Sequence, residues 1–170
     1  MFSFFDHVYG GFSVRGHRYL KKLRNSADMS LINSNLAVGG TGNIKNITKK
    51  GMQSILDLRK ESCDDKYMIK KYSIHYLRIM ISDRGVPSIQ ETQNAIDWIE
   101  TQIQQRRKVF VHCNLGRGRG PLLIVLYLIS KGMNSKLAIN IVKEKRSFTY
   151  LNKKQINFIR EFENYKNTTD

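Results

Sequence analysis

The segment 109–129 constrains the fold of this chain most strongly. It opens with the apolar run Val109-Phe110-Val111, passes through a loop with three glycines, and ends in the nearly all-apolar stretch Arg119–Ile129. The short run is typical of a strand, and the long stretch predicts a helix that is buried on every side. A strand, a tight loop and a buried helix in direct succession indicate an α/β domain.

Short strands and helices also alternate along the rest of the chain. Strands are expected at 36–38, 54–58 and 74–81, and helices at 44–50, 64–72, 88–107, 134–146 and from 152 onward. Gly51 is a typical helix terminator, and Ser88 with Glu91 forms a capping box. We therefore predict a single α/β domain, covering 31–167, with a mainly parallel central sheet flanked by helices.

The N-terminal segment, residues 1–30, differs in composition from this domain. Aromatic residues and glycines alternate loosely up to Phe12, and a basic cluster follows between Arg15 and Arg24. Such a segment suits contact with a membrane surface, a cleaved organelle-targeting peptide, or a lid packed on the domain. The sequence leaves these three alternatives open.

Net charge and cysteine content indicate which partners and which cellular compartment to expect for this chain. The chain carries a net charge of +15, which attracts phosphorylated substrates, anionic lipids or nucleic acid, although basic residues can also simply solvate a surface. Two cysteines do not make a disulfide scaffold, so an intracellular setting is expected. The longest apolar run, Leu122–Ile129, is far shorter than the roughly 20 residues of a spanning helix, which predicts a soluble or membrane-peripheral protein.

The loop between the predicted strand and helix has the features of a phosphate site. Its backbone N–H groups can curl around an anion at the N-terminus of a helix. Gly116, Gly118 and Gly120 are expected to supply the unusual backbone dihedrals that such a curl needs. Arg119 can fold back and bind two phosphate oxygens, so the predicted anion contacts are Arg119 and the five loop residues Asn114, Leu115, Gly116, Arg117 and Gly118.

Cys113, at the start of this loop, is the candidate nucleophile. Thiols at helix N-termini and beside cations ionise well below their usual pKa of about 8.5, so a thiolate is expected here. His112 is a candidate for supporting the loop from behind. The alternative is a buried core cysteine at a strand end, with glycines that only form a turn. A P-loop nucleotidase is excluded, because no Gly-Lys-Ser/Thr closes the loop.

With His112-Cys113-Asn114-Leu115-Gly116-Arg117-Gly118-Arg119, the chain resembles the protein tyrosine phosphatase superfamily, and within it the small dual-specificity branch. The resemblance extends over Leu36–Gly39, the loop Ile81–Ser88 and the helices within Ile141–Phe162. It is strongest toward the mitochondrial phosphatidylglycerophosphate phosphatase group and its plant and bacterial relatives. This resemblance implies a cysteine-dependent phosphatase with a phosphocysteine intermediate.

The resemblance also implies a general acid. The branch takes this proton from an aspartate on a mobile loop about thirty residues before the nucleophile, and Asp83 occupies that place. The alternatives are that Asp83 only stabilises a turn and that Asp57 or the pair Asp64-Asp65 supplies the proton. One position departs from the family pattern, since Gly120 stands where the family usually has Ser or Thr. Because that hydroxyl stabilises the departing thiolate, we expect slow hydrolysis of the phosphoenzyme.

Two further residues have open roles. Arg117 matches a cationic position of lipid phosphatases in this superfamily, where it would hold a second phosphate or an anionic lipid, or it is an ordinary exposed arginine. Cys63 is either an ordinary thiol or a partner that protects Cys113 by a disulfide, as in some family members.

No metal and no cofactor are expected, because the four histidines are scattered and Arg119 and backbone amides can carry the phosphate charge. The predicted substrates are phosphotyrosine, phosphoserine or phosphothreonine proteins, or a phospholipid headgroup such as phosphatidylglycerophosphate or a phosphoinositide. A phosphate-binding pseudophosphatase and an RNA 5′-triphosphatase remain as alternatives, and a nucleic-acid partner is not expected. The sequence does not predict the oligomeric state.

Overall fold

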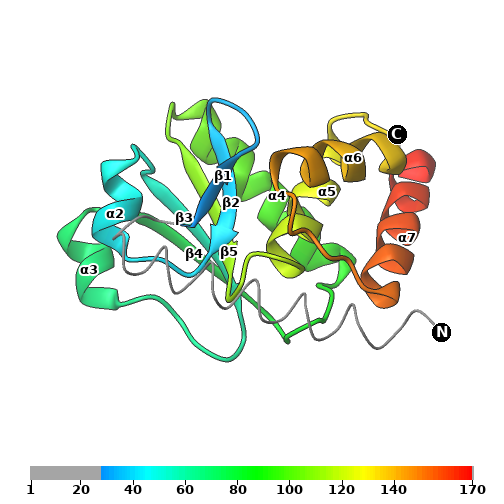
Figure 1. Cartoon of the computed structure of the whole chain (residues 1–170). Coiled ribbons are helices and arrows are strands. Elements are labelled where there is room, and N and C mark those ends of the chain that lie inside the picture. Colours follow the sequence, from blue (N-terminus) through cyan, green and yellow to red (C-terminus); the bar gives the residue numbers. More distant parts are fainter. Residues whose placement is uncertain (1–27, 170) are drawn as a thin grey trace.

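A computed structural model describes residues 28–169, which contain one five-stranded sheet (Figure 1). The strands lie in the order β1-β2-β5-β3-β4. Their bounds are β1 Met29–Leu31, β2 Leu36–Gly40, β3 Ser54–Arg59, β4 His75–Ile81 and β5 Val109–Cys113. Strand β1 is antiparallel to β2, and the other three pairings are parallel. The predicted α/β class and mainly parallel sheet are confirmed.

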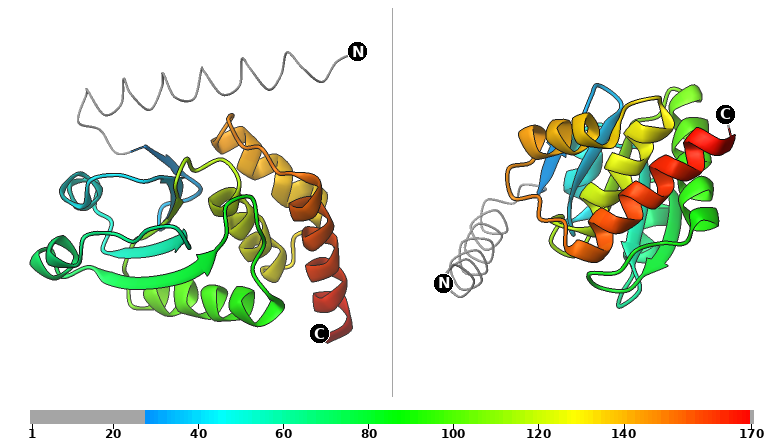
Figure 2. Two further views of the ribbon diagram at one scale, coloured as in Figure 1. Left: turned by 90° about the horizontal axis from the view of Figure 1, so that it is seen from below. Right: turned by 90° about the vertical axis from the view of Figure 1, so that its right-hand side faces the viewer.

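The helices cover both faces of the sheet. Their bounds are α2 Ile44–Lys49, α3 Lys66–Lys71, α4 Ile89–Gln104, α5 Arg119–Ser130, α6 Ser135–Lys145 and α7 Lys153–Thr169. Helices α2 and α3 pack on one face over a small apolar cluster, and α4 to α7 pack on the other over a larger one. Figures 1 and 2 show α2 and α3 well separated from α5, α6 and α7, with the strands between them.

Strand β5 lies between β2 and β3, so its C-terminal end is at the middle of the sheet. Side chains alternate between the two faces of a strand. Val109, Val111 and Cys113 belong to the apolar cluster under α5, whereas Phe110 belongs to the cluster under α2 and α3. His112 follows the same alternation, and its ring stacks on Phe110 with 5.4 Å between the centroids. The side chains of His112 and Cys113, the last two residues of β5, therefore lie on opposite faces of the sheet.

One strand was not predicted. β1 has only three residues, Met29-Ser30-Leu31, and its apolar pattern is too short to distinguish from a loop. Its first two residues precede position 31, where the sequence analysis began the domain. The expectations about residues 1–27 lie outside the described residues.

Residues 28–169 contain no helix with both the length and the apolar character that crossing a lipid bilayer requires.

Candidate active site

The loop from Cys113 to Arg119 joins the C-terminal end of β5 to the first residue of α5. Both side chains are withdrawn from solvent, with relative exposures of 3% for Cys113 and 2% for Arg119. The N-cap residue of α5 is Gly118, which has no side chain to cap the first N–H groups. Those groups and the helix dipole therefore remain directed at the loop, as at other anion-binding helix N-termini.

The loop's curvature depends on one glycine in particular. Gly116 has a φ of +64°, and a Cβ atom there would lie 2.3 Å from the carbonyl carbon of Gly39. Gly118 and Gly120 have no positive φ, so Gly116 is the one glycine of this loop in the left-handed region. Gly120 is instead set against β2, since a Cβ atom there would lie 3.1 Å from Cγ2 of Val38.

Arg146 braces the loop from behind. This arginine is 1% exposed and donates from Nε to the carbonyl oxygen of Gly116 and from Nη2 to that of Leu115. Its charge is balanced by Asp28, whose Oδ2 lies 2.9 Å from Nη2. Arg146 lies within the family-like range Ile141–Phe162, and no role was predicted for it. Nothing in the sequence separates it from the other 28 basic residues.

The end of β2 supports the other side of the loop. The amide of Thr41 donates to the carbonyl oxygen of Asn114 at 3.0 Å. The hydroxyl of Thr41 lies 3.3 Å from the carbonyl oxygens of both Cys113 and Asn114. The loop from Cys113 to Arg119 is thus held from two directions by segments far away in sequence.

The guanidinium of Arg119 is fixed by an acidic partner that sequence analysis missed. Glu61 accepts from Nη1 and Nη2 at 2.8 and 2.7 Å, and the carbonyl oxygen of Ile81 accepts from Nη1 at 2.9 Å. Burial alone would lower the pKa of Arg119. The hydrogen bonds with Glu61 and the negative charges of Cys113, Glu61 and Asp83 raise it overall. Arg119 is therefore a permanent cation beside the sulfur.

The ion pair between Arg119 and Glu61 also changes the pKa of the Glu61 carboxylate. The hydrogen bonds from Arg119 lower the pKa of Glu61 to about 2, although its side chain is 41% exposed. Glu61 therefore stays ionised throughout any ordinary assay range. Its position after β3 gave no signal in the sequence, because an exposed acidic residue in a polar loop is common.

The candidate general acid, Asp83, lies beside this pair. Its Oδ1 is 3.2 Å from Nη2 of Arg119, and its side chain is 75% exposed. The loop that carries it is docked on the start of α7. Asn152 donates to the carbonyl oxygen of Arg84 at 2.9 Å, and the buried Gln155 donates to that of Gly85 at 3.1 Å.

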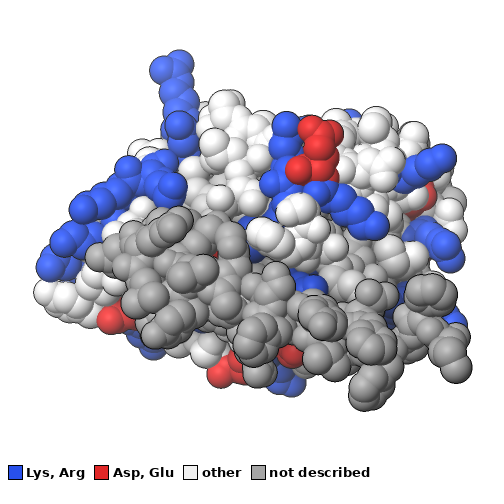
Figure 3. Space-filling model, viewed as in Figure 1, with Lys and Arg blue, Asp and Glu red and all other residues white. Residues whose placement is uncertain are grey.

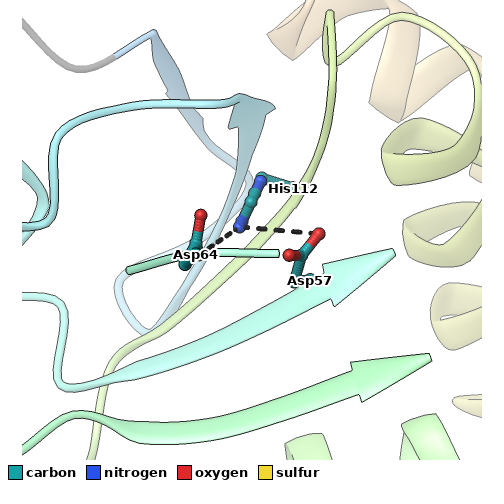
Figure 4. A group of neighbouring side chains, drawn as sticks. All are labelled: Asp57, Asp64 and His112. Carbon is teal, nitrogen blue, oxygen red and sulfur yellow. Dashed lines mark hydrogen bonds and ion pairs between the residues drawn. The ribbon is translucent and has the colours of Figure 1, made fainter. Parts of the chain in front are cut away.

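His112 points into a buried polar network with Asp57 and Asp64 (Figure 4). Its Nε2 lies 2.8 Å from Oδ2 of Asp64 and 4.0 Å from Oδ1 of Asp57. Its Nδ1 lies 3.4 Å from the carbonyl oxygen of Cys113, so the ring contacts the backbone of the loop. Asp57 and Asp64, which the sequence analysis kept as alternative acids, are buried in this network, and Asp65 caps α3.

Arg59 supplies the cation of the network. It donates from Nε and Nη2 to both oxygens of Asp57 at 2.8 Å, and from Nη2 to Asp64 at 2.6 Å. Asp57, Asp64 and His112 have the residue types of a metal site. The guanidinium already bridges the two carboxylates, which makes an ion-paired structural network the better description.

Replacing Asp57 with asparagine is expected to destabilise the fold by roughly 3–5 kcal/mol, because Arg59 would keep a buried charge without this partner. Burial alone raises the pKa of Asp57, but hydrogen bonding from Arg59 and the charge of His112 lower it overall below 3.8. Its stabilising contribution is thus present above that unfolded-state value and is lost as the pH falls through the folded value. Urea unfolding of wild type and variant between pH 2 and 7 would measure both effects.

Asp65→Asn is the matched control, since Asp65 is exposed and asparagine also caps helices well. Equal, small losses in the two variants would contradict the structural role of Asp57.

Arg117 and Cys63 flank the site in different ways. Arg117 donates from Nε to the carbonyl oxygen of Phe148 at 3.3 Å and accepts from the amide of Tyr150 at 2.8 Å. Arg117 therefore connects the loop to the segment before α7.

Cys63 is an exposed free thiol and Cys113 a buried one, so this structure contains no disulfide between them.

The family model "Dual specificity phosphatase, catalytic domain" matches residues 37–165. The chain belongs to this family of protein tyrosine and dual-specificity phosphatases, which confirms the resemblance to the dual-specificity branch. Among curated proteins, the mouse protein tyrosine phosphatase type IVA 2 is 30% identical over 105 residues, covering 59% of this chain and 62% of that protein. A putative tyrosine phosphatase of invertebrate iridescent virus 6 is 28% identical over 80% of this chain and 92% of its own.

Solved structures share the fold. The active form of Tk-PTP has a TM-score of 0.74 at 22% identity, over 81% of this chain and 97% of its own. PTPMT1 in complex with PI(5)P has a TM-score of 0.73 at 19% identity, over 83% and 97%. At this level of identity the likeness concerns the fold alone.

Proposed function

We propose that this chain hydrolyses phosphate monoesters through a phosphocysteine intermediate. The observation that carries the proposal is the pairing of Cys113 and Arg119. Both are buried, they stand at the two ends of one loop on a helix N-terminus, and Asp83 lies at Arg119. A nucleophile, a clamp and an acid are thereby assembled at the C-terminal edge of a parallel sheet, where α/β enzymes bind their ligands.

The proposed reaction has two steps. The Cys113 thiolate attacks phosphorus, the bond from phosphorus to the ester oxygen breaks, and Asp83 gives its proton to that oxygen. Water then attacks the phosphocysteine, Asp83 takes a proton from the water, and the sulfur–phosphorus bond breaks to release phosphate. Arg119 and the loop amides hold the phosphoryl oxygens throughout, which is a preorganised electrostatic contribution.

We further propose an anionic phospholipid headgroup as the substrate, rather than a phosphoprotein. Arg84, in the acid loop, and Lys154, at the start of α7, are both exposed. Their segments are joined by the bond from Asn152 to Arg84. Cations next to the acid loop would favour a substrate with negative charge beyond the phosphate ester. PTPMT1, which shares the fold, has been crystallised with a phosphoinositide. This supports the predicted phosphatidylglycerophosphate or phosphoinositide class.

The variant Arg84→Gln/Lys154→Gln should separate the two substrate classes. A cation near an anionic membrane contributes about 1 kcal/mol, so kcat/KM on vesicles containing phosphatidylinositol 5-phosphate should fall roughly 10- to 30-fold. Hydrolysis of p-nitrophenyl phosphate should remain nearly constant. The control Lys131→Gln/Lys136→Gln changes charge equally at the opposite end of α5. A preference for phosphotyrosine peptide over vesicles would overturn the lipid proposal.

The second step is expected to limit turnover, because Gly120 offers no hydroxyl to the departing sulfur. A hydrogen bond to a charged group contributes roughly 1.5–3 kcal/mol, so Gly120→Ser should speed phosphoenzyme hydrolysis about 10- to 100-fold. Rapid-mixing kinetics with p-nitrophenyl phosphate should show a burst in the wild type and a smaller one in the variant. A Cβ atom at 120 would lie 3.9 Å from the amide nitrogen of Cys113, which places the added hydroxyl close to the sulfur-bearing residue.

Gly120→Ala is the matched control, because it adds the same Cβ atom against Val38 without a hydroxyl. Steady turnover of the wild type with no burst, or equal acceleration by alanine, would contradict the assignment.

A further inference from the structure

A cavity of about 470 Å³ lies outside the candidate active site and is lined by residues of α3, of β4 and of the loops that flank α3. Figure 1 shows where α3 and β4 lie in the fold. Its lining combines apolar groups with basic ones: Cys63, Asp64, Lys66, Ile69, Lys70, Ser73, Ile74, Tyr76 and Arg78. A cavity of this size can enclose most of a small organic ligand. The mechanism proposed above makes no use of it.

The charges around the cavity are mostly positive. Lys66, Lys70 and Arg78 contribute three cations, whereas the single carboxylate, Asp64, is already paired with Arg59. Figure 3 shows basic side chains gathered on this side of the molecule, over α2 and α3. The apolar lining and the cations together favour a ligand with an apolar body and an acidic head.

We propose that this cavity binds a small amphipathic anion, meaning a carboxylate, sulfonate or phosphate attached to an apolar body, and that its occupancy alters the loop that carries Glu61. The cations bind the head group, and Ile69 and Ile74 contact the apolar body. Ligand binding in this cavity requires neither the proposed substrate nor the chemistry at Cys113.

The link to the active site consists of hydrogen bonds made by residues of the cavity wall. Arg78 donates from Nε to the carbonyl oxygen of Arg59 at 3.0 Å and from Nη2 to that of Lys60 at 3.0 Å. The hydroxyl of Tyr76 accepts from the amide of Asp64 at 3.3 Å. Both therefore hold the segment 59–64, and Glu61 within it holds Arg119. An anion that draws Arg78 toward itself competes with these carbonyl oxygens and changes how firmly Glu61 is placed.

Chemical protection of Cys63 locates the ligand. In a Cys113→Ser background, Cys63 is the single remaining thiol, and it lies in the cavity wall. The probe is 8-anilinonaphthalene-1-sulfonate, which has an acidic head on an aromatic body. It should slow the reaction of Cys63 with Ellman's reagent at least fivefold at saturation, and decanoate should compete with it. Because this background lacks the nucleophile, the result does not depend on the chain being a phosphatase.

Charge variants distinguish the cavity from the overall positive charge. Lys66→Glu/Lys70→Glu should weaken probe binding at least tenfold, whereas Lys45→Glu/Lys49→Glu, with the same change of charge on α2, should not. Ile69→Trp, which fills the cavity without altering charge, should also abolish protection. The proposed binding site would be overturned if the probe did not protect Cys63 in the parent chain, or if the two double charge variants weakened probe binding equally.

The linkage is measured in the chain with Cys113 intact. The probe should change kcat/KM for p-nitrophenyl phosphate at least twofold, and it should have no such effect on Lys66→Glu/Lys70→Glu. Protection of Cys63 together with an unchanged kcat/KM would overturn the link to Glu61. If the chain with Cys113 intact had no phosphatase activity, the proposed function would fail, and vanadate would replace the substrate. A twofold change in vanadate affinity on probe binding would then support the link, and no change would overturn it.

Discussion

Cys113→Ser is expected to abolish turnover of p-nitrophenyl phosphate, with a loss of about 10⁴-fold or more. Removing the nucleophile of a hydrolase that works through a covalent intermediate has cost up to about 10⁶-fold, and a serine hydroxyl is a much weaker nucleophile than a thiolate. The fold should be unaffected, since the two side chains are close in volume. Mass spectrometry of acid-quenched wild type should find the phosphoryl group on the peptide that contains Cys113.

Cys63→Ser is the matched control, because it removes the other thiol and should leave the rate nearly unchanged. Full activity of Cys113→Ser would contradict the proposed phosphocysteine mechanism. Wild type that binds vanadate without hydrolysing any phosphate ester would instead support the pseudophosphatase alternative.

Arg119→Lys is expected to lower kcat/KM by roughly 10²- to 10³-fold, the effect of losing one preorganised donor in other enzymes. Lysine keeps the charge but lacks the planar fork that matches a phosphoryl group. Of the five N–H donors of Arg119, Nη1 serves Glu61 and Ile81, and Nη2 gives one more to Glu61. Asp83 also lies at this guanidinium, with its Oδ1 3.2 Å from Nη2. Under the proposed mechanism, phosphate would bind the edge formed by Nε and Nη2, beside Asp83.

Glu61→Gln is the control for this second prediction. It removes the carboxylate that orients the guanidinium of Arg119 but leaves the arginine itself, so kcat/KM should fall less than in Arg119→Lys. Michaelis–Menten kinetics on both variants would compare the two losses. Activity of Arg119→Lys within a few-fold of wild type would contradict the clamp. Because the pKa of Glu61 is about 2, its ion pair is lost only as the pH falls through that value. Titration of Glu61 therefore adds nothing to the pH profile above about pH 4.

The parts of the site that the sequence predicted are local in the chain. Cys113, the loop and Arg119 lie within seven consecutive residues between a strand and a helix, so periodicity and glycine content place them together. Asp83 was assigned through resemblance, and the structure puts it 3.2 Å from Arg119. The parallel sheet followed from the alternation of elements, and the capping box at Ser88 is present as predicted.

The parts that sequence missed depend on contacts between distant segments. Glu61 meets Arg119 across 58 positions, and Arg146 meets Asp28 across 118. Single-sequence patterns carry no information about such pairs. Asp57 and Asp64 were considered as acids because a carboxylate in sequence has no visible partner. Arg59, which pairs with both, could be recognised only after β3 and the following loop were in place.

The bracing of the loop Cys113–Arg119 by Arg146 and Thr41 has a consequence for how catalytic competence arises during folding. The strand, the loop and the helix are contiguous, yet each braced carbonyl oxygen of the loop is held by a residue at least 30 positions away in the sequence. A nascent chain therefore acquires the final shape of this loop, the proposed anion site, only when α6 has docked and the short antiparallel edge strand β1 has paired with β2. Recovery of enzymatic rate would then mark the final stage of assembly, later than the formation of secondary structure.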